Sequence, residues 1–154
     1  MFLSGCGYTP LYSSKDSNYK VISLKSNVNS SLTNYIQNSI DVLSNENAEK
    51  KLNINFDYIE EISIILKDAK GNPSKNRLNV IIDLSIFDVK NKLIASRKFS
   101  ENFEYNIDDN KFNLKQYEKN IKINLIEDIT QQILEFLANL KSVSYTHLRA
   151  HETN

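Results

Sequence analysis

The residues with the clearest chemical potential are those of the run Leu3-Ser4-Gly5-Cys6, which holds the only cysteine of the chain. Its thiol can accept a diacylglycerol group, and the small residues before it let the peptide enter a narrow protease site. An aliphatic residue followed by Ser, Gly and Cys is typical of the lipobox at which bacterial lipoproteins are acylated and cut. The run predicts that Cys6 is the acylated first residue of the mature chain and that residues 1–5 are a signal-peptide remnant.

Chance is the alternative explanation, because the same four residues also occur in ordinary proteins. A functional signal peptide needs a basic region and an apolar stretch of roughly 7–15 residues before the cleavage site. Only Met1 and Phe2 precede the run here, so the lipobox interpretation implies a truncated N-terminus. The position of the one cysteine, where a lipid anchor belongs, favours that interpretation.

Residues that could form a metal or catalytic site are few. Both histidines, His147 and His151, lie in residues 142–154, a stretch that resembles translated sequencing-adapter sequence and that we expect to be non-native. A native tail that binds a metal is the alternative, because the two histidines have helical spacing, but no third ligand is near them in sequence. We therefore expect no metal and no cofactor.

Two adjacent acidic pairs, Glu60-Glu61 and Asp108-Asp109, are the remaining candidates for catalysis. Neighbouring residues of a strand point to opposite faces of a sheet, so Glu60 and Glu61 can act together only if a bulge redirects one of them. Asp108-Asp109 fits a turn before a helix. Gly71 is the only glycine beyond the N-terminus, so the chain has no glycine-rich phosphate loop. We expect a protein that is not an enzyme, with an unrecognised carboxylate site as the alternative.

Composition indicates one soluble globular domain. The chain has 154 residues, of which 40% are hydrophobic and 25% charged, enough for a single core. Lys and Arg together number 19, as do Asp and Glu, so no net charge attracts the protein to nucleic acid. No apolar run approaches the roughly 20 residues that span a bilayer, and we expect any membrane attachment to come from the acyl chains on Cys6.

The first half of the chain predicts a strand, a helix and a second strand. Aromatic and β-branched residues indicate a strand over Tyr19–Leu24, and apolar residues near a 3.6-residue period indicate a helix over 31–44. Apolar residues alternate from Leu52 to Leu66, with a break at Ile59-Glu60-Glu61 that predicts a bulge or bend.

The second half predicts two more strands and a long helix. Lys67–Arg77 has turn residues and is expected to be a connection before a third strand over 78–86. A tight turn at Asp88–Lys92, with Asn91 suited to a left-handed backbone, leads into a fourth strand over 93–105. A helix should begin near Asn113, because Asn113 with Gln116 three residues later resembles a capping box.

The order of elements is therefore β-α-β-β-β-α, and it predicts an α+β fold. We expect a two-layer sandwich in which two helices cover one face of a four-stranded, mostly antiparallel sheet. In this interpretation residues 6–18 form a lipidated tether, residues 19–141 form the domain, and residues 142–154 form a non-native tail.

Basic residues gather near the predicted ends of the sheet, where they could contact phosphate groups of a glycolipid. A solvated loop that keeps the sheet ends soluble is the alternative. The candidates for ligand binding are Lys75 and Arg77, with Lys67 and Lys70 nearby, and Lys90 and Lys92 on the next turn.

The run Cys6-Gly7-Tyr8-Thr9-Pro10-Leu11-Tyr12 resembles the opening of the LPS-assembly lipoprotein LptE family, whose members commonly begin with Cys-Gly-aromatic-x-Pro-Leu-Tyr. The order of elements is similar to the fold of that family over residues 7–141. The resemblance implies a lipid-anchored protein on the periplasmic face of the outer membrane, and Gly7 in place of Asp agrees with export to that membrane.

The resemblance also implies a partner and a ligand. LptE proteins plug the LptD β-barrel, help it fold and help to place lipopolysaccharide in the outer leaflet, without catalysis. A basic residue near the turn between the third and fourth strands is associated with lipopolysaccharide in the family, and Lys90 and Lys92 occupy that region. An auxiliary lipoprotein of a lipid-trafficking transporter is the alternative, although the heptapeptide opening is not expected there.

Overall fold

The computed structural model describes residues 17–140, so the predictions for Cys6, the heptapeptide and the tail 142–154 lie outside the described residues. The elements follow the predicted order. They are β1 (Tyr19–Ser26), α1 (Ser31–Val42), β2 (Lys50–Lys67), β3 (Pro73–Phe87), β4 (Leu93–Asn106) and α2 (Lys111–Asn139).

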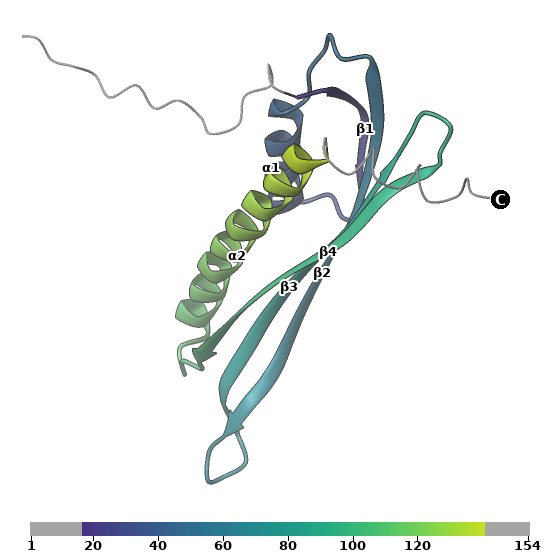
Figure 1. Ribbon diagram of the computed structural model, residues 1–154. Helices are drawn as coiled ribbons and strands as arrows, with labels where there is room; N and C mark the ends of the chain where they lie inside the picture. Colours follow the sequence, from purple (N-terminus) through teal and green to yellow (C-terminus); the bar gives the residue numbers. More distant parts are fainter. Residues whose placement is uncertain (1–16, 141–154) are drawn as a thin grey trace, which may run out of the picture.

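One sheet with the strand order β1-β2-β3-β4 forms one layer, and the two helices lie together on one of its faces (Figure 1). β1 runs parallel to β2, while β2, β3 and β4 form an antiparallel meander. A parallel pair needs a crossover connection, which α1 supplies. The predicted α+β sandwich with a mostly antiparallel sheet is therefore confirmed.

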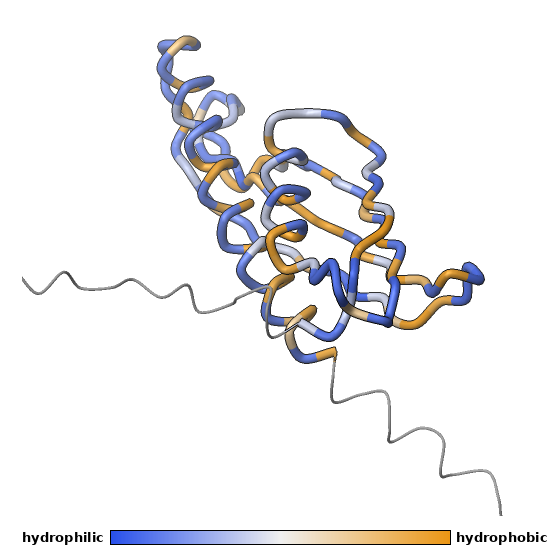
Figure 2. Tube along the Cα trace, turned by 90° about the horizontal axis from the view of Figure 1, so that it is seen from above, coloured by the Kyte–Doolittle hydropathy of each residue, from blue (hydrophilic) through white to orange (hydrophobic). Residues whose placement is uncertain are grey.

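The core lies between the sheet and the helices, and β3 is its centre. Alternate residues of β3 are completely buried, because this strand has neighbours on both sides and helices above it. They are Leu78, Val80, Ile82, Leu84 and Ile86. α1 contributes Ile36 and Ile40 to the same cluster, and α2 contributes Ile129 and Ile133. In Figure 2 hydrophobic and hydrophilic residues alternate along the elements, as expected where one side is buried and the other solvated.

The bulge predicted at Ile59-Glu60-Glu61 is wrong, because the pairing of β2 with β3 is continuous from Asn53 to Ile64. The irregularities lie between Ile64 and Lys67, near the hairpin tip. The apolar positions before and after the break are all even-numbered and share one face, and Glu60 simply occupies one place on that face.

Glu60 is tolerated on the helix side of the sheet because both of its carboxylate oxygens have partners. Lys122 Nζ of α2 lies 3.0 Å from Oε1, and the Tyr58 hydroxyl donates to Oε2 at 2.8 Å. Burial, followed by the nearby carboxylate, raises the pKa of Tyr58, so its hydroxyl remains a donor. The pair links the outer half of β2 to α2.

The long helix begins at Lys111, two residues before the predicted start. Its N-cap is Asn110, whose side-chain oxygen accepts hydrogen bonds from the backbone N–H groups of Phe112 and Asn113 at 3.0 and 3.2 Å. Asn is among the preferred N-cap residues. The N-cap is therefore the last residue of the polar run Asp108-Asp109-Asn110, and not Asn113. Neither helix of residues 17–140 has the length and hydropathy needed to cross a bilayer.

Candidate functional site at the turn between β3 and β4

The four basic residues proposed as ligand contacts do not form one cluster. Lys75 and Arg77 lie within β3, not on a connection, and the loop before β3 comprises only residues 68–72. Lys90 and Lys92 follow the other end of the same strand. Along β3, at about 3.3 Å per residue, the two groups are roughly 40 Å apart. The structure therefore offers two separate basic regions.

Lys75 and Arg77 are engaged with a carboxylate. Lys75 Nζ lies 2.7 Å from Oε2 of Glu104 on β4, and Arg77 Nη2 lies 2.6 Å from Oε1. Hydrogen bonds from these two cations hold the pKa of Glu104 below its usual range. A phosphate group would have to share both cations with Glu104, which makes this region the less favourable of the two.

Lys90 and Lys92 are held outward by the turn that joins β3 to β4. Oδ1 of Asp88 accepts hydrogen bonds from the backbone N–H groups of Lys90 at 2.8 Å and Lys92 at 2.9 Å. Asn91 has φ of 60°, as predicted, a conformation that Asn adopts more readily than most residues. Both lysine side chains are exposed, and neither forms an ion pair within residues 17–140.

The turn between β2 and β3 has the same construction. Oδ1 of Asp68 accepts from the backbone N–H groups of Lys70 and Asn72, both at 2.8 Å, and Gly71 has φ of 86°. These hydrogen bonds, that of Asn72 above all, lower the pKa of Asp68. Each hairpin thus ends in a turn in which an Asp side chain orders the backbone and a lysine projects from the tip.

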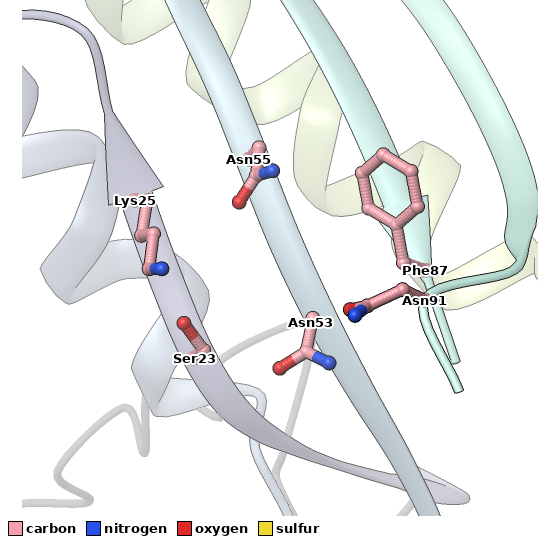
Figure 3. Close-up of a pocket in the computed structure, with 6 residues that line it drawn as sticks. All are labelled: Ser23, Lys25, Asn53, Asn55, Phe87 and Asn91. Atoms are coloured by element: carbon pink, nitrogen blue, oxygen red, sulfur yellow. The ribbon is translucent and has the colours of Figure 1, made fainter. Parts of the chain in front are cut away.

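A hollow of about 320 Å³ lies on the sheet face opposite the helices, next to the turn between β3 and β4 (Figure 3). Its lining comes from three strands and the turn, and comprises Ser23, Lys25, Asn53, Asn55, Phe87 and Asn91. Asn53 Nδ2 donates to the backbone carbonyl of Asp88 at 3.2 Å, which ties the floor of the hollow to the turn that carries Lys90 and Lys92.

The hollow has the chemistry of a site for an oxygen-rich ligand. Its lining offers amides, a hydroxyl, an ammonium group and one aromatic ring, and no carboxylate. The side chains of Lys25, Asn55 and Asn91 form no hydrogen bond or ion pair within the described part of the chain, so they are free to bind sugar hydroxyls or a phosphate group. The sequence does not predict this hollow, because its residues are far apart in the chain. The one indication is that polar residues alternate with the apolar ones along β2, which predicts a polar face there.

The two acidic pairs lie in different structural settings. Unbroken pairing through β2 places Glu60 and Glu61 on opposite faces. Asp108 accepts a hydrogen bond from the backbone N–H of Asn110 at 2.8 Å, as expected of a turn residue. Asp108 and Asp109 line an open hollow of about 570 Å³ at the start of α2. Residues 17–140 contain no group of three His, Cys, Asp or Glu side chains that could hold a metal ion.

Comparison with known proteins shows similarity of fold. No protein-family model matches the sequence, and no curated protein matches it significantly. A crystal structure of a minor lipoprotein from Acinetobacter baumannii is 18% identical, with a TM-score of 0.62 over 79% of this chain and 92% of that one. The solution structure of an uncharacterized lipoprotein B from Nitrosomonas europaea is 16% identical, with a TM-score of 0.65 over 95% and 99%.

A third similar structure is that of the rare lipoprotein B from Shewanella oneidensis. It is 15% identical to this chain, with a TM-score of 0.56 over 79% of this chain and 98% of that one. At such identities the similarity establishes a common fold. These three structural neighbours are bacterial lipoproteins, and this chain aligns with almost the whole of each of them.

Proposed function

We propose that the protein is an LptE-like lipoprotein, anchored through Cys6 to the periplasmic face of the outer membrane. It would support an LptD-like β-barrel in lipopolysaccharide assembly, without catalysis. The observation that carries the proposal is the fold shared with lipoproteins over 92–99% of their chains, in a domain that follows a lipobox. The heptapeptide after the lipobox, which resembles the LptE opening, supplies the choice of family.

The shape and polarity of the domain suit a place inside a barrel. The β2–β3 hairpin extends past the end of α2, and the β3–β4 hairpin points away from the helices at the other end of the sheet, so the sheet is elongated (Figure 1). The sheet face opposite the helices is polar, with pairs such as Ser100 with Asn79 at 3.0 Å and Lys98 with Asp83 at 3.7 Å. Such a face can exchange hydrogen bonds with the polar wall of a barrel lumen.

The lipopolysaccharide contact belongs, in this proposal, to the turn between β3 and β4. Lys90 and Lys92 form no ion pair within residues 17–140. The neighbouring hollow adds Lys25 and neutral polar groups. Charge-assisted hydrogen bonds to phosphate are stronger than neutral ones. We therefore assign lipid A or core phosphates to the lysines, and sugar hydroxyls to the hollow.

Capture of the barrel tests the partnership. The chain from Cys6 onward, placed behind a complete signal peptide and tagged, is co-expressed with an LptD-like barrel and with an unrelated outer-membrane barrel as control. We expect near-stoichiometric recovery of the LptD-like barrel alone from detergent-solubilised outer membrane. A folded, lipidated chain that recovers neither barrel would contradict the proposal and favour the transporter-associated lipoprotein.

Charge reversal tests the ligand contact. Changing Lys90→Glu and Lys92→Glu together should weaken binding of purified lipopolysaccharide about tenfold or more, because each charge-assisted contact contributes on the order of 1.5 kcal/mol. The matched control is Lys115→Glu with Lys119→Glu, two exposed α2 lysines without ion pairs in the described region, which makes the same change in net charge. Equal losses in both double variants would show a general charge effect, and no loss in the first would remove the turn from the site.

A further inference from the structure

Within residues 17–140, the outer edge of β2 has no neighbouring strand over half of its length. β1 pairs with β2 only as far as Phe56, whereas β2 continues to Lys67. Figure 1 shows this outer half projecting past the end of β1 toward the hairpin tip. From Ile59 onward, no strand of the described chain lies on that edge.

The open edge has a defined beginning. Just after β1, the Asn27 side chain forms the two hydrogen bonds that the backbone of a further strand residue would form with β2. Its Oδ1 accepts from the backbone N–H of Tyr58 at 2.8 Å, and its Nδ2 donates to the Tyr58 carbonyl at 3.3 Å. Both backbone groups of Tyr58 therefore face outward. Because these directions alternate along a strand, the N–H and C=O groups of Glu60, Ile62 and Ile64 also point to the open edge.

The edge also has a defined end and accessible side chains. Pairing with β3 becomes irregular between Ile64 and Lys67, which limits the regular open stretch to Ile59–Ile64. Ile62 is 50% exposed and Ile64 is 52% exposed. An edge strand with unpaired backbone N–H and C=O groups and exposed side chains is a template for another strand.

The charges of the edge indicate what kind of strand fits. Glu60 is neutralised by Lys122, but Glu61 forms no ion pair within residues 17–140, and its neighbour on β3 is the neutral Asn79. The regular stretch contains no lysine or arginine. A second copy would therefore bring further carboxylates and no cation, whereas a basic segment would supply the missing charge.

We infer that the stretch Ile59–Ile64 is a strand-addition site, which takes an extended segment of a partner protein with alternating apolar residues and a lysine or arginine opposite Glu61. The backbone groups of Glu60, Ile62 and Ile64 give the affinity, and the side chains of the segment give the selectivity. The inference goes beyond the proposed function, because it needs neither the barrel nor lipopolysaccharide.

The test uses designed peptides and the whole chain carrying Cys6→Ser. The probe is a seven-residue peptide of alternating isoleucine and threonine with one lysine. Its counterparts carry glutamate in place of that lysine, or N-methyl groups on the backbone nitrogens of one edge. We expect the lysine peptide to bind about tenfold more tightly than the glutamate peptide, and we expect N-methylation to weaken binding at least tenfold.

Variants of Glu61 make the result specific to this edge. Glu61→Gln should remove the preference for lysine, and Glu61→Lys should reverse it, without change in the melting temperature. Amide hydrogen exchange should show protection of Glu60, Ile62 and Ile64 on peptide binding. The inference is overturned if N-methylation has no effect, if protection appears elsewhere, or if the chain without peptide protects these amides by pairing with itself.

Discussion

Replacing Ile82 by alanine is expected to lower the free energy of unfolding by about 3–4 kcal/mol, within the range for deletion of a large buried aliphatic side chain. Ile82 is fully buried at the centre of β3, between Tyr58 on β2 and Phe99 on β4. The loss is a large part of the roughly 5–15 kcal/mol that stabilise a domain of this size. Urea denaturation followed by circular dichroism measures it.

A matched deletion separates burial from strand propensity. Ile94→Ala removes the same atoms from β4, where the side chain is 42% exposed, and should cost less than about 1 kcal/mol. Similar losses in the two variants would mean that β3 is not the centre of the core.

Replacing Cys6 by alanine, in a chain placed behind a complete signal peptide, is expected to abolish acylation and to release the protein from the membrane fraction. Diacylglycerol transfer needs the thiol, and the described chain has no helix that could span a bilayer in its place. Labelling with radioactive palmitate, together with fractionation of the envelope, reads out both effects.

A displaced thiol provides the control. Adding Ser13→Cys to the Cys6→Ala chain restores a cysteine to the same segment, but after Pro10-Leu11-Tyr12 and so outside the aliphatic-Ser-Gly context. It should recover neither label nor membrane attachment. If the alanine chain still sediments with the membrane, the anchor lies elsewhere and the lipobox interpretation is wrong.

Most of the fold is predictable from local residue patterns, because strands, helices and turns each impose a characteristic spacing or residue type. Alternation of apolar residues along β3 follows directly from a strand with one buried face, and the Asp88–Lys92 turn was evident from Asn91, which tolerates a left-handed backbone. The register error in β2 arose because Glu60 interrupts the apolar pattern. Its partner Lys122 is distant in sequence, so only the folded chain shows why a carboxylate is accepted there.

The candidate site was predictable only in part. Lys90 and Lys92 lie on a turn that the sequence indicates, and their exposure follows from it. The turn residues Gly71 and Pro73 predict a connection that includes Lys75 and Arg77, but a hairpin needs only a short loop and β3 already begins at Pro73. The pairing of these two cations with Glu104, and the hollow between β1, β2 and the turn, depend on strand neighbours that no local pattern specifies.

The two short turns described above also determine how much chain entropy each part of the sheet must lose. Joining β2 to β3, or β3 to β4, closes a loop of a few residues, whereas joining β1 to β2 requires closure over the whole crossover from Ser26 to Lys50. Closure over a several-fold longer loop costs about 1 kcal/mol more. Pairing of β1 with the sheet therefore costs the most loop entropy of the three strand pairings, and β1 is also the strand nearest to Cys6 in sequence. If Cys6 is acylated as proposed, a force applied at the anchor would act on β1 before it acts on the meander β2-β3-β4.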